Sequence, residues 1–385
     1  MENKTVKVTL ITGVCGTTGS AILDYLSLND TEVLQGSRVI IGVDNFFRGT
    51  YSNIKYHVGS KYFLFKKGRF QDLICCKDSK GQYTVKSVKT FKYNNNKGTV
   101  TYEIDEIYHM AAVVPTKYFY LNPDLTYEEN CKGTIDLFDW ARFNGVKRFI
   151  VGSSSEIYGH IYDEDIPAKE TTMSHFDSEE DSTRWSYAEG KLLTEHYLNH
   201  FKNEMERVCH LRFANTYGPR DMDNNHVLPY FVNCVVNQVP EIHVNKRYDK
   251  MFRTFLNNKD SSRACVEIMS KGRNGTAYNV GSREEISIKD LLVLIINIAR
   301  REYGIEFKSE IVESIDRSGD PIRRVLDVSR LKEDTGFVPS VTLTQGISEM
   351  IKKAIEIKEN DNKLSKVNTE ADKEIEKIFN GRCDN

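Results

Sequence analysis

The 385-residue sequence lacks several features that would assign it to a broad class of protein. It has no uninterrupted run of about 18 apolar residues, the length that crosses a bilayer, and no signal peptide is expected before the first strand. Its 53 basic residues are spread among 55 acidic ones, with a net charge of −2 and no basic stripe. Its eight cysteines form no close pairs at metal-ligand spacing. We therefore expect no membrane span, no nucleic-acid partner and no metal, and a reducing, cytoplasmic location.

A glycine-rich turn near the start of the chain joins a buried strand to a helix. The apolar residues between Val6 and Ile11 predict the strand, and the apolar spacing from Ala21 to Leu26 predicts the helix. The turn between them contains Gly13, Cys15, Gly16, Thr17, Thr18 and Gly19. Strand, glycine-rich turn and helix are the context of a dinucleotide fingerprint, because the bare backbone lets a pyrophosphate approach the helix N-terminus.

A second apolar run, residues 39–44, ends in an acid that favours one particular dinucleotide. Asp44 lies at about the right distance from the glycine-rich turn to accept hydrogen bonds from an adenosine ribose. A carboxylate at this position would repel the additional phosphate of NADP. The sequence therefore predicts NAD as the cofactor.

An alternating segment interrupts the regular order of strands and helices that follows. Residues 83–93 and 99–102 alternate between apolar and polar, and residues 94–98 have the composition of a turn. This pattern predicts an exposed β-hairpin near residues 83–102, within an insertion at 79–104. A decorative or oligomer-contact role is favoured over a substrate lid.

Two further motifs carry chemistry. Residues 146–151 predict a strand that runs into Ser154, Ser155 and Glu156, and reactive groups collect at the carboxyl ends of strands in open parallel sheets. The helix that starts near Ser186 places Tyr187 and Lys191 one turn apart on the same face. An ammonium beside a phenol should lower the pKa of the phenol toward a value useful for general-base catalysis.

The order TGVCGTTG, VDNFFRG, HMAA, SSSEIYG, YAEGK and RFANTYGPR resembles the extended short-chain dehydrogenase/reductase family, whose members modify nucleotide sugars. The resemblance covers residues 6 to about 355. It implies an α/β fold with a Rossmann-type doubly wound parallel sheet and a smaller mixed α/β substrate domain. The implied divisions are an NAD-binding domain (1–216), a substrate-binding domain partly interleaved with the sheet (217–357) and a charged tail (358–385).

The resemblance also implies residue roles. Tyr187 would take the proton of the sugar 4-hydroxyl, and Lys191 would hold the nicotinamide ribose. The remaining expected catalytic residues are Ser154, Ser155 and Glu156. The expected cofactor-binding residues are those of the glycine-rich turn together with Asp44, Asn45, Asp72, Ala111, Ala112, Asn130, Tyr187 and Lys191. The expected substrate is a nucleotide-diphosphate sugar with UDP as the expected nucleotide, and its expected ligands are Asn215, Arg220, Arg253 and Arg324.

Within the family, the pattern is most similar to the UDP-glucuronate decarboxylases. A 4,6-dehydratase is an alternative, but those enzymes usually carry Thr-Asp-Glu where this chain has Ser154, Ser155 and Glu156. A 4-epimerase is another alternative, which would leave Glu156 without a role. A catalytically silent NAD-binding regulatory protein is the hypothesis from a different class. The family also implies a homodimer through the helices at 126–144 and 187–201, with Leu137, Phe138 and Trp140 or Leu192, Leu193 and Tyr197 at the interface.

Overall fold

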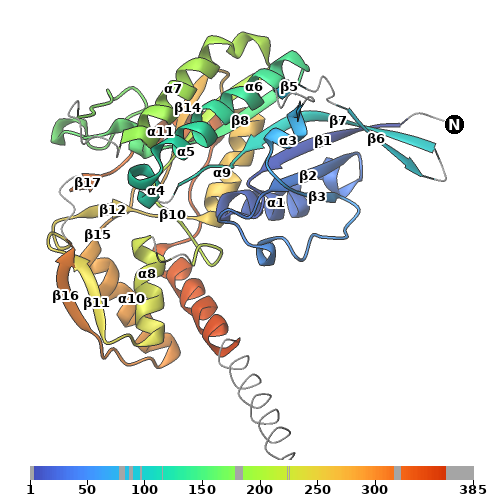
Figure 1. Cartoon of the computed structure of the whole chain (residues 1–385). Coiled ribbons are helices and arrows are strands. Elements are labelled where there is room, and N and C mark those ends of the chain that lie inside the picture. The colour runs from blue at the N-terminus through green and yellow to red at the C-terminus, as the bar shows by residue number, and fades with distance from the viewer. Residues whose placement is uncertain are drawn as a thin grey trace, which may run out of the picture.

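The computed structural model describes residues 4–77, 83–85, 90–95, 98–114, 116–177, 185–222, 224, 226–315 and 322–360. A central parallel sheet organises this part of the chain (Figure 1). Its strands, in spatial order, are β3 (Phe63–Lys67), β2 (Arg38–Asp44), β1 (Lys4–Thr12), β7 (Gly98–His109), β8 (Arg148–Ser154), β9 (Arg207–Phe213) and β14 (Thr276–Val280). The order reverses direction between β1 and β7, where doubly wound sheets bind their ligands. The predicted Rossmann-type fold is confirmed.

Helices cover both faces of this sheet. On one face, α1 (Thr17–Asn29), α9 (Asn258–Lys271) and α11 (Ser329–Thr335) share an apolar core with the strands. On the other face, α6 (Gly133–Phe143) and α7 (Ser186–His200) do the same. Leu137, Phe138 and Trp140 belong to this second core and are at most 2% exposed, so their expected place in a dimer interface is wrong. They face the sheet of their own subunit.

The long helix expected at 126–144 is present but is not uniform. It starts as α5 (Pro123–Tyr127), passes through a π-helical turn, η2 (Glu128–Lys132), and continues as α6. Asn130 lies in the π-helical turn, where its side chain accepts a hydrogen bond from the Val113 N–H at 2.7 Å and donates one to the Val113 carbonyl at 2.8 Å. Single π-helical turns often mark functional sites. This one ties the helix to the loop that follows β7.

A second apolar core contains most of the buried apolar side chains that come after residue 217. It is built from α8 (Val227–Asn237), α10 (Ile288–Tyr303) and a helix at 343–360. Small sheets complete this lobe: β10 (Thr216–Tyr217) with β13 (Leu256–Asn257), β11 (Glu241–Asn245) with β16 (Glu310–Ile315), and β12 (Phe252–Thr254) with β15 (Glu285–Ser287) and β17 (Arg323–Arg324).

The chain passes between the two lobes more than once. The elements α9, β14 and α11 come after residue 217 but pack into the main sheet and its core. The interleaving expected from the sequence is therefore visible, whereas the exact boundaries remain a prediction. None of the described helices is long and apolar enough to cross a membrane.

The predicted hairpin is partly as expected. β6 (Thr90–Asn95) pairs antiparallel with β7, and Asn95 faces Gly98 across the turn. The second arm of the hairpin is longer than the expected 99–102, since β7 runs unbroken for 12 residues into the main sheet. The described parts of 83–93 pair with different strands: β5 (Tyr83–Val85) with β4 (Cys75–Lys77), and β6 with β7. Residues 78–82, 86–89 and 96–97 lie outside the described part.

Four of the remaining short elements contribute residues to the cavity that is described below: η1 (Tyr51–Asn53), α3 (Gln71–Ile74), α4 (Thr116–Leu121) and η3 (Ser155–Tyr158). Three others do not: α2 (Thr31–Leu34), η4 (Asp163–Asp165) and η6 (Lys202–Glu204).

Gly19→Ala tests how tightly α1 packs on the glycine-rich turn, and Gly190→Ala on α7 serves as its control. A Cβ at Gly19 would collide with the Gly13 carbonyl, so Gly19→Ala should destabilise the protein by about 1–3 kcal/mol. A Cβ at Gly190 on α7 would only reach Cys131 Cβ at 3.6 Å, an ordinary contact. Gly190→Ala should therefore keep or raise stability, by up to about 1 kcal/mol. Urea unfolding of the two variants measures the difference, and equal stability would contradict it.

Candidate active site

A cavity of about 880 Å³ lies between the carboxyl ends of the central strands and the smaller lobe. Most of the residues that the sequence singles out line this cavity. From the cofactor set they are Gly13, Cys15, Gly16, Thr17, Thr18, Gly19, Asp44, Asn45, Ala111, Ala112 and Tyr187. From the catalytic and substrate sets they are Ser154, Ser155, Glu156, Asn215, Arg220 and Arg324. Segments as far apart in the chain as Gly13 and Arg324 thus meet at one site.

The glycine-rich turn, residues 13–19, borders a space that side chains would fill, and this space is called the seat below. Gly13 has φ +69°, and a Cβ there would lie 2.7 Å from the backbone nitrogen of Ala111. Gly16 is the N-cap of α1, and its side-chain-free backbone leaves the first N–H groups of the helix facing the cavity. A dinucleotide pyrophosphate needs this combination of open space, unpaired N–H groups and the positive end of a helix dipole.

Asp44 is fixed at the edge of the seat by two backbone groups. The N–H of Cys15 donates to one carboxylate oxygen at 2.8 Å, and the N–H of Phe46 donates to the other at 2.7 Å. Burial raises the pKa of Asp44, and these two hydrogen bonds oppose the shift. Cys15 itself is buried, and burial raises the pKa of its thiol to about 12. It therefore packs as a small neutral residue.

Tyr187 and Lys191 sit on the buried face of α7, but not as a simple pair. The Lys191 Nζ donates to the Gly152 carbonyl at 2.6 Å and lies 5.9 Å from the centroid of the Tyr187 ring. Tyr187 stacks on Phe119 with centroids 4.6 Å apart. Burial raises the pKa of Tyr187, while a hydrogen bond with Ser154 and the charge of Arg48 act in the opposite direction. The expected lowering of this pKa by Lys191 is wrong here, because burial dominates and the ammonium is turned toward Gly152.

Glu156 is paired with a buried arginine from the other end of the chain. Its carboxylate forms an ion pair with Arg324 of β17, and its N–H donates to the Ser154 hydroxyl at 3.2 Å. The Arg324 side chain is 7% exposed. Its Nε and Nη2 atoms are buried without a hydrogen-bond partner among the described residues. The guanidinium therefore retains unused donors at the wall of the cavity.

Four of the predicted site residues do not reach the cavity. Lys191 and Asn130 are buried behind its wall, where their side chains bond to Gly152 and Val113. Asp72 is exposed and accepts a hydrogen bond from the Arg69 N–H at 3.2 Å. Arg253 donates to the carbonyls of Phe252 at 2.8 Å and Ile322 at 3.2 Å.

Near Asp72, Arg69 and Gln71 line the cavity and both bond Glu129. Arg253 is the register partner of Arg324 across β12 and β17, but its guanidinium bonds the Phe252 and Ile322 carbonyls and is not part of the cavity lining. Arg324, on the neighbouring strand β17, is the arginine that lines the cavity.

Two contacts across the site were not predicted from the sequence. Arg48, which the sequence analysis did not single out, donates to Asp221 at 2.9 Å, lies 3.2 Å from His226 and thereby links the loop after β2 to the loop before α8. Arg220, an expected substrate ligand, forms an ion pair with Asp24 of α1 and donates to the Asn53 carbonyl at 2.9 Å. Both arginines lie within quoted motifs, VDNFFRG and RFANTYGPR, but the motifs do not indicate these partners.

Comparison with known proteins identifies the family. The model of the family described as "NAD dependent epimerase/dehydratase family" matches residues 9–281. The chain belongs to this family. It is therefore an NAD-dependent enzyme, and the prediction of NAD as cofactor is confirmed at the level of the family.

Individual relatives represent three related reactions. UDP-glucuronic acid decarboxylase 1 of Arabidopsis thaliana is 26% identical over 344 residues, covering 89% of this chain and 68% of the relative. The UDP-glucose 4-epimerase of Thermotoga maritima, solved with UDP-glucose, matches with a TM-score of 0.70, 23% identity and coverage of 91% of this chain and 99% of that one. A dTDP-glucose 4,6-dehydratase of Streptomyces venezuelae, solved with NAD, matches with a TM-score of 0.72, 19% identity and coverage of 91% and 97%.

The burial of Lys191 predicts a pH dependence for this epimerase/dehydratase-family enzyme. Burial lowers the pKa of Lys191 to about 8. A lysine is charged below its pKa, so the ammonium is present at neutral pH and is lost as the pH rises through about 8. Turnover that depends on this charge should decline over that range. The rate of sugar-nucleotide conversion from pH 6 to pH 10 measures it, and a flat profile up to pH 10 would rule it out.

Proposed function

We propose that this enzyme removes the carboxyl group of a UDP-linked hexuronic acid, as UDP-glucuronate decarboxylases do. The observation that carries the proposal is the buried Arg324 guanidinium, whose Nε and Nη2 atoms have no partner among the described residues. Unpaired buried donors on a charged group are costly, and a carboxylate meets them with two parallel hydrogen bonds. A sugar hydroxyl can accept from one such donor, but it offers neither the charge nor the paired oxygens of a carboxylate. The motifs quoted in the sequence analysis and the similarity to UDP-glucuronic acid decarboxylase 1 of Arabidopsis thaliana point to the same substrate class.

The residues of the site have distinct tasks in this reaction. NAD supplies a hydride acceptor that oxidises C4 of the sugar and later returns the hydride. Tyr187, hydrogen-bonded with Ser154, takes the proton of the 4-hydroxyl. Once C4 is a ketone, the C5 carboxylate belongs to a β-keto acid. The C5–C6 bond then breaks, carbon dioxide leaves, and the electron pair is delocalised onto the C4 oxygen.

Glu156 and Arg324 act at the other side of the sugar ring. Arg324 orients the carboxylate before the bond breaks, and Glu156 is positioned to supply the proton that C5 then requires. The Glu156–Arg324 ion pair keeps both groups at the end of β8, next to Ser154. No net oxidation occurs, so a tightly held cofactor suits the reaction.

Two other reactions of the family fit the site less well. A 4,6-dehydratase needs an acid that protonates the departing 6-hydroxyl, and this chain has Ser155 where those enzymes usually have an aspartate. A 4-epimerase needs Tyr187 and a rotating keto-sugar, and would leave the Glu156–Arg324 pair without a task. A silent NAD-binding protein would not need a tyrosine held by Ser154 at the cavity wall.

Product analysis separates these possibilities. The protein should convert UDP-glucuronate to the UDP-pentose with release of carbon dioxide, and should leave UDP-glucose and UDP-N-acetylglucosamine unchanged. Mass spectrometry of the three incubations measures the outcome. Loss of water from any of them would establish a dehydratase, and an isomer of unchanged mass would establish an epimerase.

Replacing Glu156 tests its step separately from the oxidation step. Glu156→Gln removes a proton-transferring group, so turnover of UDP-glucuronate should fall by about 10²-fold or more. The absorbance of transient NADH should persist, because Tyr187 and Lys191 still support oxidation at C4. Tyr187→Phe is the matched control and should abolish that absorbance. Near-normal turnover of Glu156→Gln would refute both the decarboxylase and the dehydratase and leave the epimerase.

We also propose a cytoplasmic homodimer that pairs through α6 and α7. Five of the eight cysteines are free thiols, as a reducing compartment maintains them: Cys15, Cys131, Cys209, Cys234 and Cys265. Large apolar side chains on the elements of this face are exposed: Leu193 at 50%, Phe143 at 71% and Tyr127 at 50%. They replace the buried Leu137, Phe138 and Trp140 as the candidate contacts.

Light scattering tests the dimer. The wild-type protein should have twice the subunit mass at micromolar concentration, and Leu193→Glu combined with Phe143→Glu should reduce it to the subunit mass. The exposed Val338, which lies away from these helices, offers a control as Val338→Glu. A monomeric wild-type protein would contradict the proposal.

A further inference from the structure

Three residues on one face of α7 each contact a different residue at the end of β8. Tyr187, Lys191 and Glu195 follow one another at intervals of four residues and are 6%, 1% and 2% exposed. Tyr187 is hydrogen-bonded with Ser154. Lys191 donates to the Gly152 carbonyl at 2.6 Å, and Glu195 accepts from the Ser153 hydroxyl at 2.5 Å. Three successive residues of the strand are therefore held by three successive turns of the helix.

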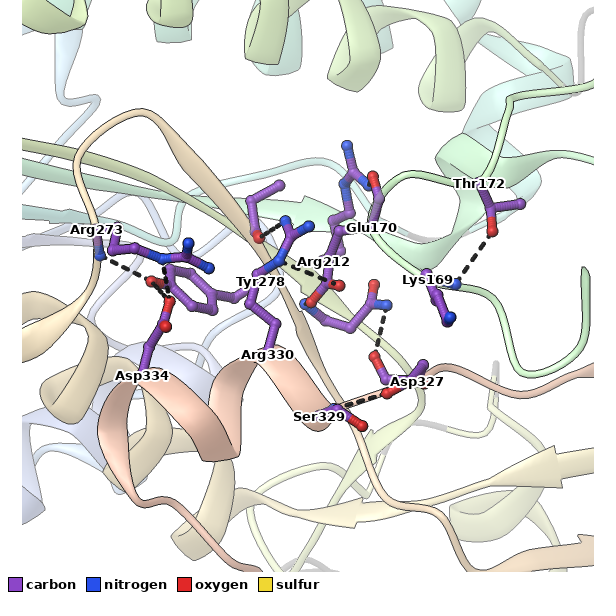
Figure 2. A network of polar contacts seen from close by, with 12 residues as sticks. Lys169, Glu170, Thr172, Arg212, Arg273, Tyr278, Asp327, Ser329, Arg330 and Asp334 are labelled. Atoms are coloured by element: carbon purple, nitrogen blue, oxygen red, sulfur yellow. Dashed lines mark hydrogen bonds and ion pairs between the residues drawn. The ribbon is translucent and has the colours of Figure 1, made fainter.

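Glu195 is held in turn by an arginine from the next strand. Arg212 of β9 donates from Nη2 to Glu195 Oε2 at 2.7 Å and from Nε to both carboxylate oxygens at 3.1 and 3.2 Å. The same guanidinium donates to the Tyr158 hydroxyl at 3.0 Å and to the Glu170 carbonyl at 2.9 Å. Figure 2 shows Arg212 beside Glu170, within a polar network that extends to Tyr278 and Asp334.

The Lys191 ammonium has few charges around it. The groups that face it are Tyr187 and Glu195 of its own helix, Cys131 of η2 and His109 of β7. Burial lowers the pKa of His109 to about 3, so that ring is neutral, and burial raises the pKa of the Cys131 thiol. Of these facing groups, Glu195 is the one that carries a negative charge at neutral pH, since Arg212 and the Ser153 hydroxyl hold its pKa below the usual value against burial.

We propose that Glu195 is a positioning residue of the reaction, which keeps Lys191 charged and fixes the strand end that carries its partner Gly152 and the Tyr187 partner Ser154. The proposal rests on the roles of Tyr187 and Lys191 given under the proposed function. Glu195 touches neither the cavity nor the reacting atoms. It acts through the buried charge on Lys191 and through the Ser153 hydroxyl.

A purely structural ion pair is the competing explanation. Buried ion pairs often stabilise a fold little, because desolvation offsets their attraction, yet removing one partner is costly. Such a pair predicts that Glu195→Gln lowers stability and leaves the ionisation of Lys191 unchanged. A positioning residue predicts that the ionisation of Lys191 changes in a variant that remains folded.

The decisive measurement is the pKa of Lys191 itself, followed by NMR of protein labelled with ¹⁵N-lysine, with Lys191→Met used to assign the signal. In Glu195→Gln, loss of the facing carboxylate should lower this pKa by about one unit or more. The alkaline limb of kcat against pH should move to lower pH in parallel. Asp139→Asn is the matched control, because Asp139 accepts from the Tyr197 hydroxyl of α7 at 2.8 Å but does not face Lys191. It should leave the pKa of Lys191 in place.

A second variant covers the case in which Glu195→Gln does not fold. Glu195→Gln with Arg212→Met removes both charges, so no unpaired guanidinium remains, and it should still lower the pKa of Lys191. An unchanged pKa in either folded variant would overturn the proposal. The NMR titration needs no substrate, so its outcome is distinct from failure of the proposed function, which would show as absence of NADH and of product in the wild-type protein.

Discussion

The burial of the Lys191 ammonium against the end of β8 is the constraint on which the rest of the site depends. A buried cation requires an acceptor and a compensating charge, and here the Gly152 carbonyl and Glu195 provide them. Both come from segments that also position Tyr187 and Ser154. The helix, the strand end and the ion pair with Arg212 are therefore not separable features. A shift of α7 by one turn would separate Lys191 from the Gly152 carbonyl and Tyr187 from Ser154.

The features that the sequence predicted well depend on local signals. The fully buried strand β2 follows from an unbroken apolar run, and the seat follows from glycines whose Cβ atoms would meet backbone. Strand ends in a parallel sheet lie along one edge, so placing Ser154, Asp44 and Gly13 at the same edge required only the order of strands and helices. The spacing of four residues between Tyr187 and Lys191 likewise fixed their shared face.

The features that the sequence did not predict depend on contacts between distant segments. Nothing near Arg48 or Arg220 indicates that their partners are Asp221 and Asp24, which lie 173 and 196 residues away in the chain. Arg253 matched a motif, but its guanidinium bonds the carbonyl of Ile322, which lies 69 residues away in the chain. The pKa of Tyr187 is a further case, since proximity to Lys191 was visible in the sequence whereas complete burial, which dominates the shift, was not.

The Glu156–Arg324 pair connects this architecture to the choice among the three reactions. The two residues are 168 positions apart and come from different lobes, so the pair forms only when the smaller lobe is folded onto the sheet. The remaining Arg324 donors, Nε and Nη2, would let a substrate carboxylate share this guanidinium with Glu156. In the proposed decarboxylation, loss of carbon dioxide passes the negative charge to the enolate oxygen and makes C5 the proton acceptor. A neutral sugar brings no carboxylate to this guanidinium, so the pair favours the decarboxylase over the other two reactions.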